Sequence, residues 1–235
     1  GTAIPPSAGA PGVGFQGSIL GVIQALDANG ARGVISNIPN VLAFPYFTTI
    51  PYNGLTLDSS QVVTINSVFN PLGITFIEGD NGFTVEDPST PFGVRKLVEG
   101  ELILLSIPLD SVKCFGLGSI SPIPGKYVLD LNEIAEINSK IDEYNTILVS
   151  LADLYDLALV DAHQLYSSLT SGVIYNGVAM NAEFVTGGFY SLDGRNLNPI
   201  GQALLANKYI EAMNAKFGAE IPHAPVTNFP GVVFP

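Results

Sequence analysis

Residues 189–210, FYSLDGRNLNPIGQALLANKYI, predict a loop that leads directly into a helix. Asn198 is a favoured helix N-cap, and Pro199 suits the first turn because an N–H at that position would have no partner within the helix. Asp193 and Asn196 lie three positions apart in the loop just before this helix. They are the candidate site residues of the chain.

Helices and short apolar strands alternate along the chain before this segment. Asp130 and Glu133 have the spacing of a capping box, and apolar residues then recur every three or four positions to about residue 155. Further helices are predicted at 15–29 and 59–69, and Asn176-Gly177 indicates a hairpin within residues 172–185. Three apolar runs are predicted to be buried strands, at residues 33–38, 101–107 and 157–161.

This alternation predicts an α/β fold with three layers, α/β/α, and a mostly parallel sheet. We expect one domain over residues 1–235, with residues 40–100 forming an irregular excursion within it. Three strands are few for such a sheet, and a narrow sheet leaves a strand edge exposed. The sequence therefore predicts an open edge, covered by an upstream segment or by a partner chain.

Composition excludes several classes of protein. Of the 235 residues 47% are apolar and 13% are charged, which is typical of a globular chain rather than a disordered one. The net charge is −12 and basic residues do not cluster, so nucleic-acid binding is not expected. A single cysteine, Cys114, rules out an intrachain disulfide and is predicted to be buried. With His163 and His223 far apart in sequence, neither a metal site nor a cofactor is expected.

Several segments along almost the whole chain resemble the SGNH hydrolases, or GDSL-like lipases and acylhydrolases. The similarity is carried by ALDANGARGVISNIPNVLAFPYFTTIPYN, FGVRKLVEGELILLSIP, PGKYVLDLNEIAEI, LALVDA and, most specifically, FYSLDGRNLNPIGQALLANKYIEAMNAKFGAEIP. The resemblance implies a flavodoxin-like three-layer fold and carboxylic-ester hydrolysis by a Ser-His-Asp arrangement. It also implies a bacterial protein that is secreted or held in the cell envelope.

The resemblance places Asp193 at the position of the triad acid and Asn196 at the position of the family's histidine. Leu197 stands where proline is usual, and the Gly-Asp-Ser and Gly-x-Asn-Asp blocks of the family are not found in the sequence. The nucleophile and two oxyanion donors are therefore expected upstream of this chain. A carboxamide does not accept a proton at neutral pH. Losing a triad member costs on the order of 10⁴–10⁶ in kcat.

The sequence leaves three functions open. The first is an SGNH-like esterase scaffold that is catalytically impaired. The second is a non-catalytic module of the cell envelope that binds an acylated glycan or a lipid. The third is an active esterase, acting on an ester-bearing small molecule, that is completed by an upstream segment carrying the serine.

Individual residues also have two interpretations. Asp193 is the inherited triad acid or a carboxylate that supports the turn before Asn198. His163 and His223 are interpreted as ordinary surface or packed histidines rather than relocated bases. Asn37 and Asn40 flank the end of a predicted strand and could approach the site. Three aromatic residues either line a cleft or fill a core, namely Tyr46, Phe47 and Tyr52.

Overall fold

The computed structural model describes residues 14–232, which form two compact units of mixed helix and strand. The first unit runs up to Phe44 and resumes at Glu136, and the second comprises Pro45–Ala135. Most of the predicted excursion, residues 40–100, therefore lies in the second unit.

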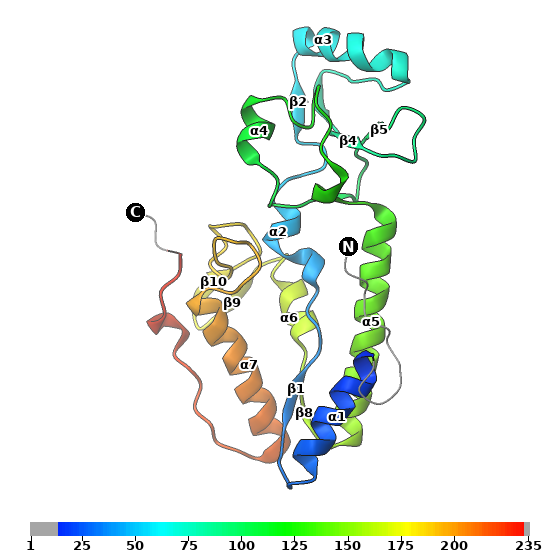
Figure 1. The fold of residues 1–235 in the computed structure, drawn as a ribbon. Coiled ribbons are helices and arrows are strands. Elements are labelled where there is room, and N and C mark those ends of the chain that lie inside the picture. Colours follow the sequence, from blue (N-terminus) through cyan, green and yellow to red (C-terminus); the bar gives the residue numbers. More distant parts are fainter. Residues whose placement is uncertain (1–13, 233–235) are drawn as a thin grey trace. The chain divides into compact units, whose positions relative to one another are not determined.

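The first unit contains long helices, one parallel pair of strands and one hairpin (Figure 1). In chain order its elements are α1 (Phe15–Asp27), β1 (Val34–Ser36), a 3-10 turn (Val41–Ala43), α5 (Leu131–Leu154, which begins in the second unit), β8 (Ala158–Val160), α6 (Ala162–Ser168), β9 (Val173–Tyr175), β10 (Val178–Met180), α7 (Pro199–Phe217) and a 3-10 turn (Val226–Asn228).

Strands β1 and β8 pair in parallel, with Ile35 opposite Leu159. They confirm the strands predicted at 33–38 and 157–161. Helix α1 packs against α5 through stacked rings of Phe15 and Tyr144, whose centroids are 4.1 Å apart. In the described residues this sheet has two strands, one fewer than the three strands predicted from the sequence.

The helix ends follow the predicted chemistry. The Asp130 carboxylate accepts the backbone N–H groups of Asn132 and Glu133 at 2.8 Å, and the Glu133 carboxylate accepts the N–H of Asp130 at 3.0 Å. This capping box starts α5 as the sequence predicts. Gly218, with φ of 63°, ends α7 in the left-handed conformation.

A core of large side chains forms where α6, the β9–β10 hairpin and α7 meet. It includes four residues that are almost completely buried, and its seven members are Ala162, Tyr166, Leu169, Met180, Phe189, Tyr190 and Leu204. The predicted hairpin is confirmed, with Asn176 and Gly177 both at positive φ in its two-residue turn. This core anchors the loop that carries Asp193.

The second unit is built from short helices and three antiparallel strand pairs. Its elements are α2 (Pro45–Thr48), β2 (Leu55–Leu57), α3 (Ser59–Phe69), a 3-10 turn (Asn70–Leu72), β3 (Gly79–Asn81), β4 (Thr84–Glu86), β5 (Val94–Lys96), β6 (Leu102–Ile103), α4 (Leu109–Cys114), a 3-10 turn (Gly125–Tyr127) and β7 (Val128–Leu129). Helix α3 confirms the prediction at 59–69.

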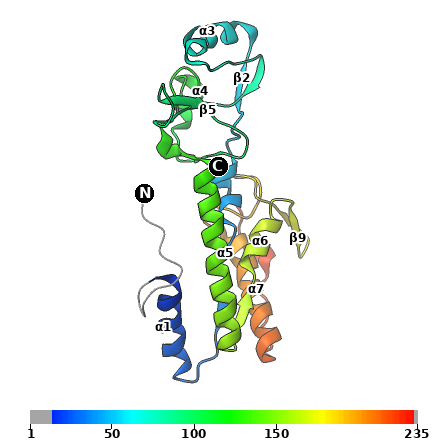
Figure 2. The same cartoon turned by 90° about the vertical axis from the view of Figure 1, so that its right-hand side faces the viewer.

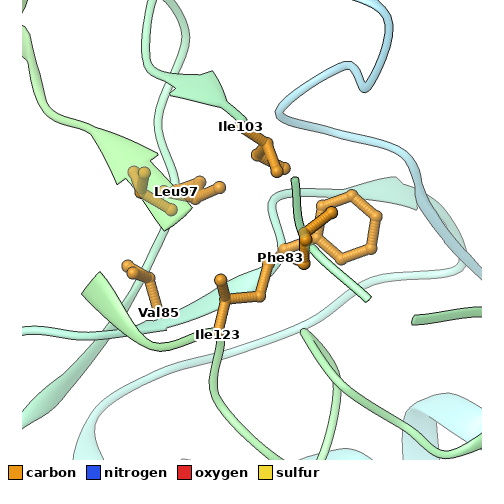
Figure 3. Packing of buried hydrophobic residues seen from close by; sticks show 7 residues of the cluster. Phe83, Val85, Leu97, Ile103 and Ile123 are labelled. Carbon is orange, nitrogen blue, oxygen red and sulfur yellow. The ribbon is translucent and has the colours of Figure 1, made fainter. Parts of the chain in front are cut away.

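The run at 101–107 does not extend the parallel sheet as expected. Only Leu102–Ile103 forms a strand, β6, and it pairs antiparallel with β7 in the second unit. Ile103 and Ile107 are instead buried in that unit's main core, which Figure 3 shows around Phe83 and Val85. A short apolar run predicts that a segment is buried. Its hydrophobic periodicity does not distinguish a strand of the sheet from another buried segment.

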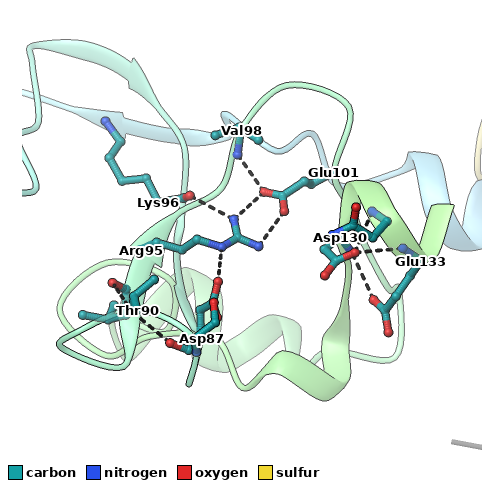
Figure 4. A network of polar contacts seen from close by, with 11 residues as sticks. Asp87, Thr90, Arg95, Lys96, Val98, Glu101, Asp130 and Glu133 are labelled. Carbon is teal, nitrogen blue, oxygen red and sulfur yellow. Dashed lines mark hydrogen bonds and ion pairs between the residues drawn. The ribbon is translucent and has the colours of Figure 1, made fainter. Parts of the chain in front are cut away.

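A buried ion pair braces the second unit (Figure 4). The guanidinium of Arg95 donates to both oxygens of Glu101, at 2.6 and 2.8 Å, and its Nε donates to Asp87 at 2.6 Å. Glu101 is only 4% exposed and also accepts the backbone N–H of Val98 at 2.8 Å. Every charge in this cluster therefore has a partner within the unit.

Candidate functional site

The candidate site lies in the loop between β10 and α7. Asn198 joins this loop to the helix: its Oδ1 accepts the N–H of Gly201 at 2.9 Å, and its Nδ2 donates to the carbonyl of Gly188 at 3.0 Å. Glycine is needed at 201, because a Cβ there would lie 2.4 Å from the carbonyl oxygen of Phe189. The predicted N-cap is thus confirmed, and it fixes the base of the loop.

The structure brings Asp193 and Asn196 into direct contact. Oδ1 of Asp193 accepts the backbone N–H groups of Arg195 and Asn196, each at 2.9 Å, and Oδ2 accepts the Asn196 side-chain amide at 2.5 Å. The Ser191 hydroxyl lies 3.0 Å from Oδ1 of Asp193 and 2.9 Å from the carbonyl oxygen of Asn196. The carboxylate therefore organises the turn and also touches the residue at the expected base position.

These donors stabilise the ionised carboxylate. The N–H of Arg195 is the largest cause that lowers the pKa of Asp193 to about 2; burial opposes it, and the N–H and amide of Asn196 and the hydroxyl of Ser191 lower the pKa further. Asp193 is therefore charged at neutral pH and is a very weak base.

The contact between Asp193 and Asn196 can be compared with the contact between acid and base in a catalytic triad. In a Ser-His-Asp triad, the carboxylate accepts an N–H of the imidazole and so holds the ring in place. Here the Asn196 amide supplies the N–H, but its nitrogen cannot take up a proton. The pair can orient a ligand by hydrogen bonding, and it lacks a general base.

Ser191 belongs to this cluster, although the sequence interpretation did not single it out. Its hydroxyl faces a carboxylate whose pKa is about 2, so it is not activated as a nucleophile. The signal was a Ser-x-Asp spacing in a loop, which is typical of side chains that hydrogen-bond a local turn.

A second polar cluster lies at the carboxyl ends of the two parallel strands. The Asn37 amide donates to the Asp161 carboxylate at 2.8 Å, and its oxygen accepts the N–H of His163 at 2.8 Å. Asp161 also accepts the N–H of Gln164 at 2.9 Å and so caps α6. The two parallel strands therefore place polar groups at one edge. None of its hydrogen bonds in the described residues reaches Asp193.

The histidines keep the ordinary roles that the sequence favours. His163 donates its backbone N–H to Asn37 and lines a cavity of about 560 Å³ together with Asp142 and Asn145. Nδ1 of His223 lies 3.5 Å from the hydroxyl of Tyr175. Neither ring contacts Asp193 or Asn196 in the part of the chain that the structure describes.

The remaining candidates lie elsewhere. Asn40 donates to the hydroxyl of Ser167 at 3.4 Å, within the first unit. In the second unit, Tyr46 and Phe47 meet edge to face at 5.0 Å, and Tyr52 packs against the core. The structure thus favours packing for Tyr52.

Three further observations concern metal binding, membrane spans and the single cysteine. Across residues 14–232, His, Cys, Asp and Glu side chains do not gather into any group of three that could hold a metal ion. None of the helices in this range is long and apolar enough to cross a membrane. Cys114 is exposed rather than buried, because it lies at the end of the short helix α4.

Comparison with known proteins adds no relative. No protein-family model, curated protein or solved structure matches the chain.

Proposed function

We propose that this chain is the carboxyl-terminal part of an SGNH-hydrolase-like protein whose esterase chemistry is impaired by asparagine at position 196. In this proposal the two parallel strands belong to a larger flavodoxin-like, three-layer sheet. The protein would be secreted or held in a bacterial cell envelope, where its family acts on esters.

One observation carries the proposal, namely the hydrogen bond from the Asn196 amide to the Asp193 carboxylate. It lies in a loop that runs directly into α7, as the family's Asp-x-x-His block does. A turn carboxylate needs only backbone partners. The additional side-chain contact three residues on is what an acid position facing a base position would show.

The open edge of β1 supports an upstream segment. Gly33 and Asn37 direct their backbone groups to β8, so strand alternation turns the N–H and C=O groups of Val34 and Ser36 to the other side. In the described residues no third strand pairs with them. We expect a strand from an upstream segment, or from a partner chain, to cover this edge.

An apolar groove lies beside the same strand. It has a volume of about 240 Å³ and is lined by α1, β1 and Leu157. Val22 and Leu26 of α1 border it and are 60% and 58% exposed. Exposed apolar area of this kind, next to unpaired backbone groups, is what a missing layer of an α/β/α domain would leave.

The alternative function is binding without turnover. Asp193, Asn196 and Ser191 form a hydrogen-bonding cluster that lacks a base, so a retained cleft could hold an acylated glycan or a lipid and leave its ester intact. A third function, an active esterase completed upstream, requires a general base other than Asn196, and the cluster around Asp193 does not supply one.

The decisive experiment treats the complete natural polypeptide with a fluorophosphonate probe and measures its intact mass. The proposal predicts a species larger than this chain that labels weakly or not at all, and faster labelling and ester turnover after Asn196→His. Strong labelling of the unaltered protein would instead establish an active esterase. No response to Asn196→His, in a folded protein that contains the Gly-Asp-Ser block, would favour the binding module. A complete polypeptide without that block would refute the esterase scaffold.

A further inference from the structure

A cavity in the first unit lies beside β8, apart from the Asp193 loop. Its volume is about 480 Å³, within the range of roughly 300–1,000 Å³ that is usual for ligand pockets. The end of β8, α6, β9 and α7 line it. Neither Asp193 nor Asn196 takes part, so the inference below does not depend on the proposed function.

The free edge of β8 supplies one wall of this cavity. Ala158 donates its N–H to Gly33 at 3.0 Å, and Val160 accepts the N–H of Asn37 at 3.1 Å, so these two residues face β1. Strand alternation therefore directs both the N–H and the C=O of Leu159 away from β1. Leu159 lines the cavity, and within residues 14–232 neither group has a backbone partner.

A donor and an acceptor on one residue, on the same side, match one residue of an added strand. The mixed lining of the cavity includes the apolar residues Leu165, Val173 and Leu204, of which Leu204 is 1% exposed. An alkyl chain could fill this space, but it would cover the two polar groups of Leu159 without pairing them. An unpaired buried group costs about 1–3 kcal/mol.

The charges at the cavity favour a basic group on the ligand. Lys208 is compensated by Glu211, with Nζ and Oε2 at 2.7 Å. Asp161 also lines the cavity, and it accepts hydrogen bonds from two neutral donors, the Asn37 amide and the Gln164 backbone N–H. Its negative charge is therefore the one that a cation on the ligand would meet.

We propose that this cavity binds a short extended peptide, which adds to β8 as a further strand. The peptide backbone pairs with Leu159, an apolar side chain covers Leu165, Val173 and Leu204, and a basic side chain lies near Asp161. Such a ligand pairs with the strand edge and covers the apolar wall, whereas an alkyl chain leaves the two polar groups of Leu159 unpaired.

The proposal is tested by titrating the unaltered chain with the probe N-acetyl-Leu-Val-Lys-amide. NMR and calorimetry monitor the titration. We expect saturable binding with a downfield shift of the Leu159 amide proton. A peptide methylated at its central backbone nitrogen, and one with norleucine for lysine, should each bind about tenfold more weakly, which corresponds to about 1.4 kcal/mol. Equal binding of all three peptides, or no binding of the first, would overturn the proposal.

A matched pair of variants locates the site. Ala212→Leu adds volume to the cavity wall and should weaken binding of the probe at least about tenfold. Ala206→Leu makes the same change at an exposed position of α7 outside the cavity and should leave binding unchanged. Equal effects of the two variants would show that the probe does not bind in this cavity. Displacement of the probe by decanoate, or self-association that competes with the probe, would show that the cavity takes another occupant.

Discussion

In the second unit, Arg95 forms ion pairs with both Asp87 and Glu101, and a core around Phe83 is enclosed by the unit's own short strands. Within the described residues of the first unit, a parallel pair of strands has unpaired backbone groups on both outer sides, and α1 exposes Val22 and Leu26. The two regions therefore differ in how completely each one covers its own strand edges and apolar side chains.

The difference lies in how each region obtains its hydrogen bonds. Antiparallel strands pair through short turns, so a segment such as the second unit can satisfy its backbone locally. Parallel strands need crossover connections, so each strand depends on others far away in sequence. The open edges of β1 and β8 are therefore where further chain or ligand is expected.

The largest effect is expected from Arg95→Met in the second unit. The change leaves Glu101 charged, buried and without its cation, which typically costs about 3–5 kcal/mol of unfolding free energy. Hydrogen exchange of amides in β4 and β5 measures it. Lys140→Met removes the Lys140–Glu143 pair, whose carboxylate is 44% exposed, and as a control should cost less than about 0.5 kcal/mol. Equal losses would mean that the buried cluster does not brace the unit.

The next effect separates the open unit from a completed one. Leu26→Ala should cost less than about 0.5 kcal/mol in this chain, because Leu26 is 58% exposed, but about 2 kcal/mol or more in the complete polypeptide, where an added layer would cover it. Denaturant unfolding of both proteins measures the difference. Ile23 is already buried in this chain, at 7% exposure, so Ile23→Ala should cost a similar amount in both proteins and serves as the control. An equally small loss from Leu26→Ala in both would indicate that nothing covers the groove.

The sequence predicts local structure better than it predicts which distant strands pair. The capping residues Asp130 and Asn198 and the turn at Asn176-Gly177 are decided by neighbours within a few positions, and the helices and hairpin they mark are present. The apolar run at 101–107 depended on partners far away and was assigned to the wrong kind of strand pairing.

The candidate site shows the same limit. The contact between Asp193 and Asn196 could be anticipated from their spacing, since three residues span one turn of chain. The participation of Ser191 and the unpaired edge at Leu159 could not, because both depend on the course of the backbone. The polar pair Asn37–Asp161 lies between these cases, since each residue follows a strand that was predicted.

Asn198→Ala tests how firmly the site loop is held in the open unit. The change leaves the N–H of Gly201 and the carbonyl of Gly188 without their side-chain partner in a buried place, and should cost about 1–2 kcal/mol. Gln202→Ala, at an exposed position in the same turn of α7, should change stability by less than about 0.5 kcal/mol. Thermal unfolding compares them. A loss below about 0.5 kcal/mol for Asn198→Ala would show that the loop holds its shape without the cap.

The smallest effect is a pH dependence that each unit carries separately. The pKa values of Asp193 and Asp87 are both lowered to about 2, in Asp193 chiefly by the N–H of Arg195 and in Asp87 chiefly by the hydroxyl of Ser89, followed by Arg95. A carboxylate with a depressed pKa stabilises the folded state above its unfolded pKa, near 3.8, and loses this contribution as pH falls toward 2.

Stability should therefore fall between about pH 4 and pH 2. Asp193→Asn should flatten this fall for amides of α7 only, and Asp87→Asn for amides of β4 and β5 only, as followed by hydrogen exchange across the acid range. Both carboxylates are solvent-accessible, so salt and water weaken each contribution, and the change of slope is the quantity to compare. If Asp193→Asn left the α7 profile unchanged, the ionised carboxylate would not be stabilising the turn. The hydrogen bond between Asp193 and Asn196 would then contribute nothing measurable to stability.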